Sequence, residues 1–280
     1  MNQSWMPSDE DGYVNAPRPG LLGWLRVVVR ALPMVVLTFG GLLILLALRP
    51  LERALHGLQR PWTSRLTQWV CVADLSIAGL RLEVSGAPMS EGGAVVANHS
   101  SWLDIFVLNA AKRIYFVSKA EIASWPGIGW LARATGTIFI RRDPREAKAQ
   151  TEVFRERMAA GHKLLFFPEG TSTDGLRVLP FKSTLFGAFF DPALRPHLHV
   201  QPVSVIYHAP VGQDPRFYGW FGGHEFGAHL VQVLSHPRRG RVQVIWHPPL
   251  AAAEVANRKE MAALAEAAAR GGLPEARRIV

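Results

Sequence analysis

Cysteine is nearly absent from this chain, which has Cys71 as its only thiol among 280 residues. A single cysteine excludes a disulfide scaffold and a zinc site built from several cysteines. Acidic residues are also few, because 22 Asp and Glu face 31 Lys and Arg and leave a formal charge of +9. Yet 49% of the residues are hydrophobic and the mean hydropathy is +0.10. A basic chain that is also apolar suits an anionic membrane surface better than a solvated nucleic-acid patch.

Charge is missing altogether from residues 31–48, which read ALPMVVLTFGGLLILLAL. Eighteen helical residues rise about 27 Å, close to the minimum for crossing a bilayer core. Apolar residues at 21–29 extend this run, and Pro33 makes a straight helix less favourable. We therefore expect a membrane-embedded segment that either crosses the bilayer or dips into it. A buried core helix is the alternative.

Composition and patterning divide the chain into four parts. Residues 1–20 predict a flexible polar tail, 21–65 a membrane-embedded helical segment, 66–250 a globular domain, and 251–280 a helical tail. Within the domain, short apolar strands alternate with helices, which is typical of α/β layers. The expected strands are 80–84, 94–97, 114–118, 137–140, 163–167, 200–207 and 241–246, and the expected helices are 103–111 and 146–160.

A first polar cluster, NHSSWLD at 98–104, lies where an expected strand gives way to a helix. The ordinary pKa of histidine lies nearest neutrality, so His99 can accept a proton from a hydroxyl, with Asp104 as the nearest orienting carboxylate. The two side chains meet only if His99 lies in the turn and Asp104 in the first turn of the helix. Ser100 or Ser101 could cap this helix, and the free amides there could hold developing negative charge. A capping loop with a solvated histidine is the alternative.

A second cluster follows the expected strand at 163–167 and reads Pro168-Glu169-Gly170-Thr171. The apolar strand delivers a carboxylate into a Gly-Thr turn, where the missing side chain of Gly170 permits close approach of a ligand. A strand-end turn with a solvated glutamate is the alternative interpretation.

Taken together, the two clusters resemble the glycerolipid acyltransferase family, membrane-bound enzymes that acylate lysophosphatidate and related lysolipids. NHSSWLD (98–104) is similar to the family's H-x-x-x-x-D block, and GTIFIRR (136–142) to its G-x-x-F-I-x-R block. FPEGTS (167–172) is similar to F-P-E-G-T-R except at its last residue, and VQPVSV (200–205) to a strand with an embedded proline. The resemblance covers roughly residues 65–250.

The resemblance implies a division of roles. His99 would act as the general base with Asp104 orienting it, so that the lipid hydroxyl attacks an acyl thioester directly, without a protein nucleophile. The acceptor-binding residues that it implies are Lys119, Arg142, Glu169, Gly170, Thr171 and Ser172. It also implies an α/β fold with a mixed sheet flanked by helices, preceded by one or more membrane-embedded N-terminal helices. No metal and no cofactor are expected, and acyl carrier protein or coenzyme A would carry the acyl group as co-substrate.

One departure from the family pattern concerns the acceptor. Family members that act on lysophosphatidate usually have an arginine after E-G-T, where its planar fork holds the phosphate, but this chain has Ser172. Arg177 and Lys182 are close enough in sequence to substitute for it. The stretches 171–188 and 217–226 look more like the bacterial branch that acylates lyso-ornithine lipid, whose head group has a carboxylate and an amine. Lyso-ornithine lipid is therefore the expected acceptor, and lysophosphatidate is the alternative.

The expected partners are membrane lipids and acyl carrier protein, without nucleic acid. The resemblance implies a bacterial inner membrane, with the active domain on its cytoplasmic side. Two other classes of protein fit this sequence less well. A non-enzymatic, membrane-anchored basic protein has no need for His99, Asp104 and Glu169 in this order. A lipid hydrolase normally carries G-x-S-x-G, which this sequence lacks.

Overall fold

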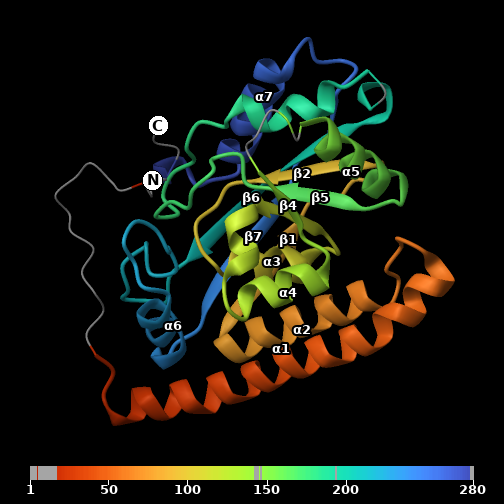
Figure 1. The fold of residues 1–280 in the computed structure, drawn as a ribbon. Helices are drawn as coiled ribbons and strands as arrows, with labels where there is room; N and C mark the ends of the chain where they lie inside the picture. Colours follow the sequence, from red (N-terminus) through yellow and green to blue (C-terminus); the bar gives the residue numbers. More distant parts are fainter. Residues whose placement is uncertain (1–4, 6–17, 142–144, 146, 193, 278–280) are drawn as a thin grey trace.

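A mixed sheet of eight strands forms the centre of the computed structural model, which describes residue 5 and residues 18–141, 145, 147–192 and 194–277 (Figure 1). The strands are β1 (Leu80–Ser85), β2 (Gly93–Ala97), β3 (Tyr115–Lys119), β4 (Ile138–Ile140), β5 (Lys163–Phe166), β6 (His199–His208), β7 (Gly240–Trp246) and β8 (Leu250–Ala251). The predicted α/β fold with a mixed sheet is confirmed, and each predicted strand is present within one or two residues of its expected ends.

The strand order is β1-β7-β6-β2-β5-β3-β4, with β8 paired to β6. Strands β6, β2, β5, β3 and β4 run parallel to one another, whereas β7 and β8 are antiparallel to β6, and β7 pairs in parallel with β1. The carboxyl ends of β2, β5, β3 and β6 consequently lie at one edge of the sheet, where α/β proteins commonly bind ligands.

Helices cover both faces of this sheet. The α-helices are α1 (Leu21–His56), α2 (Thr63–Ala78), α3 (Asp104–Ala111), α4 (Ile128–Thr135), α5 (Ala147–Ala159), α6 (Phe226–Ser235) and α7 (Arg258–Gly271). Short 3-10 helices include η3 (Ser183–Phe190) and η5 (Glu275–Arg277). The sequence did not predict α4 or α6, and the helical tail begins at Arg258 because β8 and a turn occupy the preceding residues.

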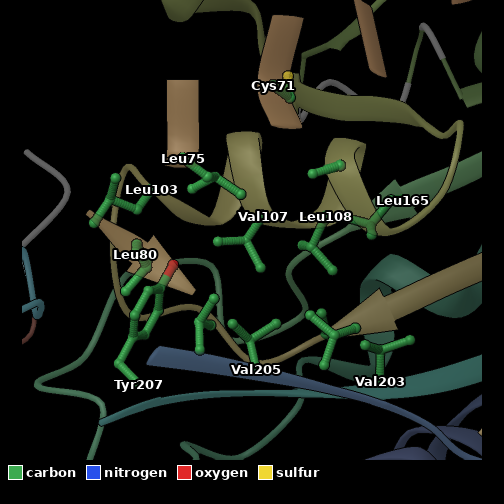
Figure 2. Packing of buried hydrophobic residues seen from close by; sticks show 14 of the residues in the cluster. Cys71, Leu75, Leu80, Leu103, Val107, Leu108, Leu165, Val203, Val205 and Tyr207 are labelled. Atoms are coloured by element: carbon green, nitrogen blue, oxygen red, sulfur yellow. The ribbon is translucent and has the colours of Figure 1, made fainter. Parts of the chain in front are cut away.

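Two cores pack against opposite faces of the central strands. In β2, Val95 joins the core under α2 and α3, while its neighbour Val96 joins the core under α7 and η3. Figure 2 shows the first core, where Val107 and Leu108 of α3 lie over Val205. All five residues of β2 are buried, because successive side chains point to opposite faces and both faces are covered. This rigid centre positions the loop that follows β2.

The predicted apolar N-terminal helix is confirmed as α1, which runs for 36 residues along α2 and includes Pro33 and Pro50 (Figure 1). Within the described residues it is the one helix long and apolar enough to cross a membrane. Its outer side chains are exposed and apolar, among them Leu22, Val29, Val36, Leu43 and Leu55.

Candidate active site

His99 lies in the loop after β2, and Asp104 is the first residue of α3. The imidazole Nδ1 of His99 lies 2.7 Å from Oδ2 of Asp104. The structure therefore brings the two side chains together across the loop-to-helix turn, as their five-residue spacing required. The ring of Phe167 stacks on the face of the His99 imidazole with centroids 4.0 Å apart, and this packing restricts the orientation of the imidazole. The His99 side chain remains 21% exposed.

Asp104 is fully buried, and its two oxygens accept several hydrogen bonds. Oδ2 accepts from the backbone amides of Ser100 at 2.8 Å and Ser101 at 3.0 Å, and Oδ1 accepts from the hydroxyl of Tyr207 at 2.6 Å. Donors of this kind stabilise the ionised carboxylate. An ionised Asp104 accepts only, so Nδ1 of His99 carries the proton and Nε2 carries the lone pair of a general base.

One expectation for this loop is wrong. The amides of Ser100 and Ser101 were candidates for holding developing negative charge, but both donate to Asp104 and are not free for an oxyanion. The carboxylate at the first helical position collects these amides, and the residue before it, Leu103, makes no side-chain cap. The loop is thus organised to hold the carboxylate of Asp104.

Glu169 follows β5, which neighbours β2 in the sheet. Its Oε1 accepts a 2.6 Å hydrogen bond from the backbone amide of His99, and Oε2 accepts one of 2.8 Å from the amide of Leu179. Burial raises the pKa of Glu169 to about 8, although the two amides act in the opposite direction. Only 1% of the residue is exposed, so in this structure the carboxyl group contacts protein backbone and positions the loop that carries His99.

The rest of the E-G-T-S block forms a tight turn beside the histidine loop. Gly170 has a positive φ of 74°, a conformation that favours glycine. Oγ1 of Thr171 accepts a hydrogen bond of 3.4 Å from the backbone amide of Trp5. The hydroxyl of Ser172 donates a 2.6 Å hydrogen bond to the backbone carbonyl of Trp220 and thereby connects this turn to the loop that precedes α6.

The candidate basic residues are two implied by the resemblance, Lys119 and Arg142, and two near the E-G-T-S block in sequence, Arg177 and Lys182. Lys119 ends β3, the strand next to β5, and is half-buried at the same edge of the sheet. Arg142 lies outside the described residues. The side chain of Lys182 is exposed, whereas Arg177 lies 3.2 Å from Asp174 and is mostly buried.

The sequence did not predict two residues that contact the site, Tyr207 and Trp5. Tyr207 holds Asp104, and its place at the end of a parallel strand was the available signal, because such ends meet at one edge. Trp5 contacts Thr171 across 166 residues of chain, and the polar sequence around it gave no signal. Among the described residues, no group of three or more His, Cys, Asp and Glu side chains is placed to hold a metal ion.

Known proteins match both the sequence and the fold. Residues 81–206 match the family model described as Acyltransferase. A protein of Rhodobacter capsulatus named lyso-ornithine lipid O-acyltransferase is 56% identical over 255 residues, which cover 91% of this chain and 92% of that one. A protein of the same name from Pseudomonas aeruginosa is 32% identical, covering 88% of this chain and 93% of the other.

The fold resembles the crystal structure of a 1-acyl-sn-glycerophosphate acyltransferase from Thermotoga maritima. The TM-score is 0.63, and the match covers 89% of this chain and 94% of the other. Sequence identity across this match is 20%, so the likeness supports the fold alone.

Proposed function

Because this chain belongs to the glycerolipid acyltransferase family and is an O-acyltransferase, we propose that it acylates the free hydroxyl of lyso-ornithine lipid to give ornithine lipid. The observation that carries the reaction type is the His99–Asp104 pair, with Nε2 of His99 left as the base. The acceptor is supported by the relatives' name and by Ser172, which supplies no positive charge for a phosphate.

In the proposed reaction, Nε2 of His99 takes the proton of the acceptor hydroxyl as its oxygen attacks the thioester carbonyl carbon. Asp104 stabilises the imidazolium that forms. The new C–O ester bond replaces the C–S bond, and the departing thiolate recovers the proton as a thiol. Thiolates are good leaving groups, so activation of the hydroxyl is the step that needs help.

The reaction requires no covalent acyl-enzyme. Cys71 is buried in α2 within the core, and burial raises the pKa of its thiol to about 12. A thiol with this pKa provides almost no thiolate at neutral pH. The donor is a thioester on acyl carrier protein or coenzyme A. Both carriers are cytoplasmic, which supports an active domain on the cytoplasmic side of the membrane.

Helix α1 supplies the membrane attachment. The domain contacts it near its start, where Arg30 donates to the carbonyls of Leu234 and His236, and near its end, where the carboxylate of Glu52 accepts from the amide and hydroxyl of Thr63, the first residue of α2. A 36-residue helix is about 54 Å long. A helix that crosses a bilayer cannot keep both ends on one globular domain, so we place α1 in the plane of the membrane with its apolar outer face in lipid.

The layer beside α1 is also apolar. Trp130 of α4 is 60% exposed and Trp69 of α2 is 71% exposed. A methyl group added at Gly127, before α4, would lie 3.8 Å from the ring of Phe39 on α1. The turn that leads into α4 therefore lies next to α1. Exposed tryptophans in this layer suit the headgroup region of a bilayer.

The deciding assay uses the purified, detergent-solubilised chain with two lysolipids, lyso-ornithine lipid and lysophosphatidate, and with both thioester donors. We expect transfer to lyso-ornithine lipid and loss of nearly all transfer in His99→Ala. His197→Ala is the matched control, because His197 is exposed in a 3-10 helix at residues 195–197. Much faster use of lysophosphatidate would overturn the acceptor, and full activity of His99→Ala would overturn the mechanism.

A further inference from the structure

The position that usually carries the phosphate-binding arginine is closed to that role in this chain. Ser172 is neutral, and its hydroxyl donates to the carbonyl of Trp220 at 2.6 Å. The head group of lyso-ornithine lipid nevertheless carries a carboxylate, and removing a carboxylate from water without pairing its charge is costly in free energy. Another cation near the E-G-T-S block is therefore needed.

Arg177 belongs to a turn that packs directly on the histidine loop. The hydroxyl of Thr173 lies 3.2 Å from the carbonyl oxygen of His99 and 3.3 Å from that of Arg177. The backbone amide of Thr173 also donates to the His99 carbonyl at 2.9 Å. A methyl group added at Gly175 would lie 3.4 Å from Cβ of Ser100. These contacts fix the backbone of Arg177 beside the catalytic base.

The guanidinium of Arg177 is held on two sides. Its Nη2 lies 3.2 Å from Oδ2 of Asp174, which is 2% exposed. The ring of Trp5 lies under the guanidinium, 5.1 Å from ring centroid to Cζ, and the amide of Trp5 donates to Thr171. Trp5 thus connects Arg177 to the E-G-T-S block. Within the described part of the chain, Nε of Arg177 has no hydrogen-bond acceptor.

We propose that Arg177, held by Asp174 and Trp5, binds the carboxylate of the acceptor head group and takes the place of the arginine missing at position 172. This inference rests on the proposed function. A guanidinium pairs with a carboxylate through parallel N–H donors. Nε of Arg177 is buried without an acceptor while 23% of the side chain is exposed, so a carboxylate bound at the exposed part of the guanidinium would supply the missing acceptor. Trp5 and Asp174 are positioning residues in this arrangement.

The charges around Arg177 favour one carboxylate over a phosphate. Asp174 faces two cations, Arg177 and Arg277 of η5. Burial lowers the pKa of Arg277, and the charge of Asp174 opposes that shift. Two guanidinium groups and one carboxylate leave one positive charge, which matches a single carboxylate. A phosphate monoester brings roughly 1.5 to 2 negative charges at neutral pH and is matched less well.

The test compares two acceptors, lyso-ornithine lipid and its carboxyl methyl ester, which keeps the reacting hydroxyl and loses the negative charge. For Arg177→Ala, we expect KM for the acid to rise roughly 10- to 100-fold, the usual value of a hydrogen bond to a charged group. We expect KM for the ester to change much less, because the ester offers Arg177 no charge to bind. For Arg177→Lys, we expect a KM for the acid between those of the unmodified enzyme and Arg177→Ala, because lysine keeps the positive charge but lacks the planar pair of N–H donors.

Arg81→Ala is the matched control, because Arg81 is an exposed arginine on the edge strand β1. If Arg177→Ala fails to fold, the comparison of acid and ester on the unmodified enzyme and on Arg177→Lys carries the test. Equal losses on acid and ester, or no loss on the acid, would overturn the role of Arg177 while leaving the proposed function intact. Failure of the unmodified enzyme to acylate lyso-ornithine lipid would overturn both.

Discussion

The hydroxyl of Tyr207 donates a hydrogen bond of 2.6 Å to Oδ1 of Asp104. Tyr207 lies near the end of β6, and burial together with the charge of Asp104 raises its pKa well above the ordinary value. The phenol therefore stays protonated and remains a donor. The carboxylate that orients His99 is in this way tied to the sheet as well as to its own loop.

Tyr207→Phe should weaken both stability and transfer. The change leaves Oδ1 of a buried carboxylate without this donor, which costs about 1–3 kcal/mol of unfolding free energy. We expect kcat to fall as well, because Asp104 is then less firmly placed against His99. Urea unfolding and steady-state kinetics measure the two effects. Tyr218→Phe is the control, since its ring neighbours that of Tyr207 and its hydroxyl lies beside Gly240. Equal effects of the two variants would contradict the role of Tyr207.

Glu169 should make stability depend on pH in an identifiable window. Its folded pKa of about 8 lies above the ordinary 4.5, so the folded state keeps a proton that the unfolded chain has released. This contribution to stability is fully present below pH 4.5 and is lost as the pH rises to 8. We expect Glu169→Gln to lose less stability than the unmodified chain between pH 5 and pH 8.

Unfolding free energies at pH 5 and pH 8 test this expectation. Glu254→Gln provides the control, because Glu254 is exposed and its substitution should leave the pH dependence unchanged. An identical pH dependence in Glu169→Gln and the unmodified chain would show that Glu169 titrates normally. Two buried histidines, His162 and His229, have pKa values lowered by burial to about 3 and about 4. They destabilise the fold as the pH falls below about 6.5, but they do so equally in the unmodified chain and in Glu169→Gln, so the difference between the two reports on Glu169.

The contact between His99 and Asp104 could be predicted from sequence because it depends on local structure. The apolar run before Asn98 predicts a central strand, and the strand-to-helix turn then allows His99 and Asp104 to meet. The orientation of the backbone amides could not be predicted in the same way. From the sequence, we expected the backbone amides in this turn to be free to stabilise negative charge on the substrate, whereas those of Ser100 and Ser101 donate to Asp104.

Contacts between distant segments were the hardest to foresee. Ser172 bonds to Trp220 across 48 residues, and Trp5 to Thr171 across 166. Such pairs depend on the path of the whole chain and leave no periodic signature in either segment. The missing arginine at position 172 was visible from sequence, but the position of Arg177 against the histidine loop required the fold.

Ser172→Arg should shift acceptor choice toward lysophosphatidate. The substitution adds a planar donor fork and one positive charge beside the E-G-T turn, and it removes the hydrogen bond to the Trp220 carbonyl. We expect the ratio of kcat/KM for lysophosphatidate over lyso-ornithine lipid to rise by roughly tenfold or more. Ser172→Ala separates the two effects, because it removes the hydrogen bond without adding charge. A similar change in the ratio for both variants would assign it to the loop rather than to the arginine.

The two ends of α1 should lie on the same side of the membrane. The native Cys71 should contribute little background labelling, because it is 5% exposed and burial raises the pKa of its thiol to about 12. Arg18→Cys and Leu58→Cys place reactive thiols at exposed positions just outside the two ends of the helix. With a membrane-impermeant maleimide, we expect both to react in inside-out vesicles and neither in intact spheroplasts. A helix that crosses the bilayer would instead expose one thiol in each preparation. Because the domain contacts α1 near both Arg30 and Glu52, labelling from opposite sides would also require those contacts to break.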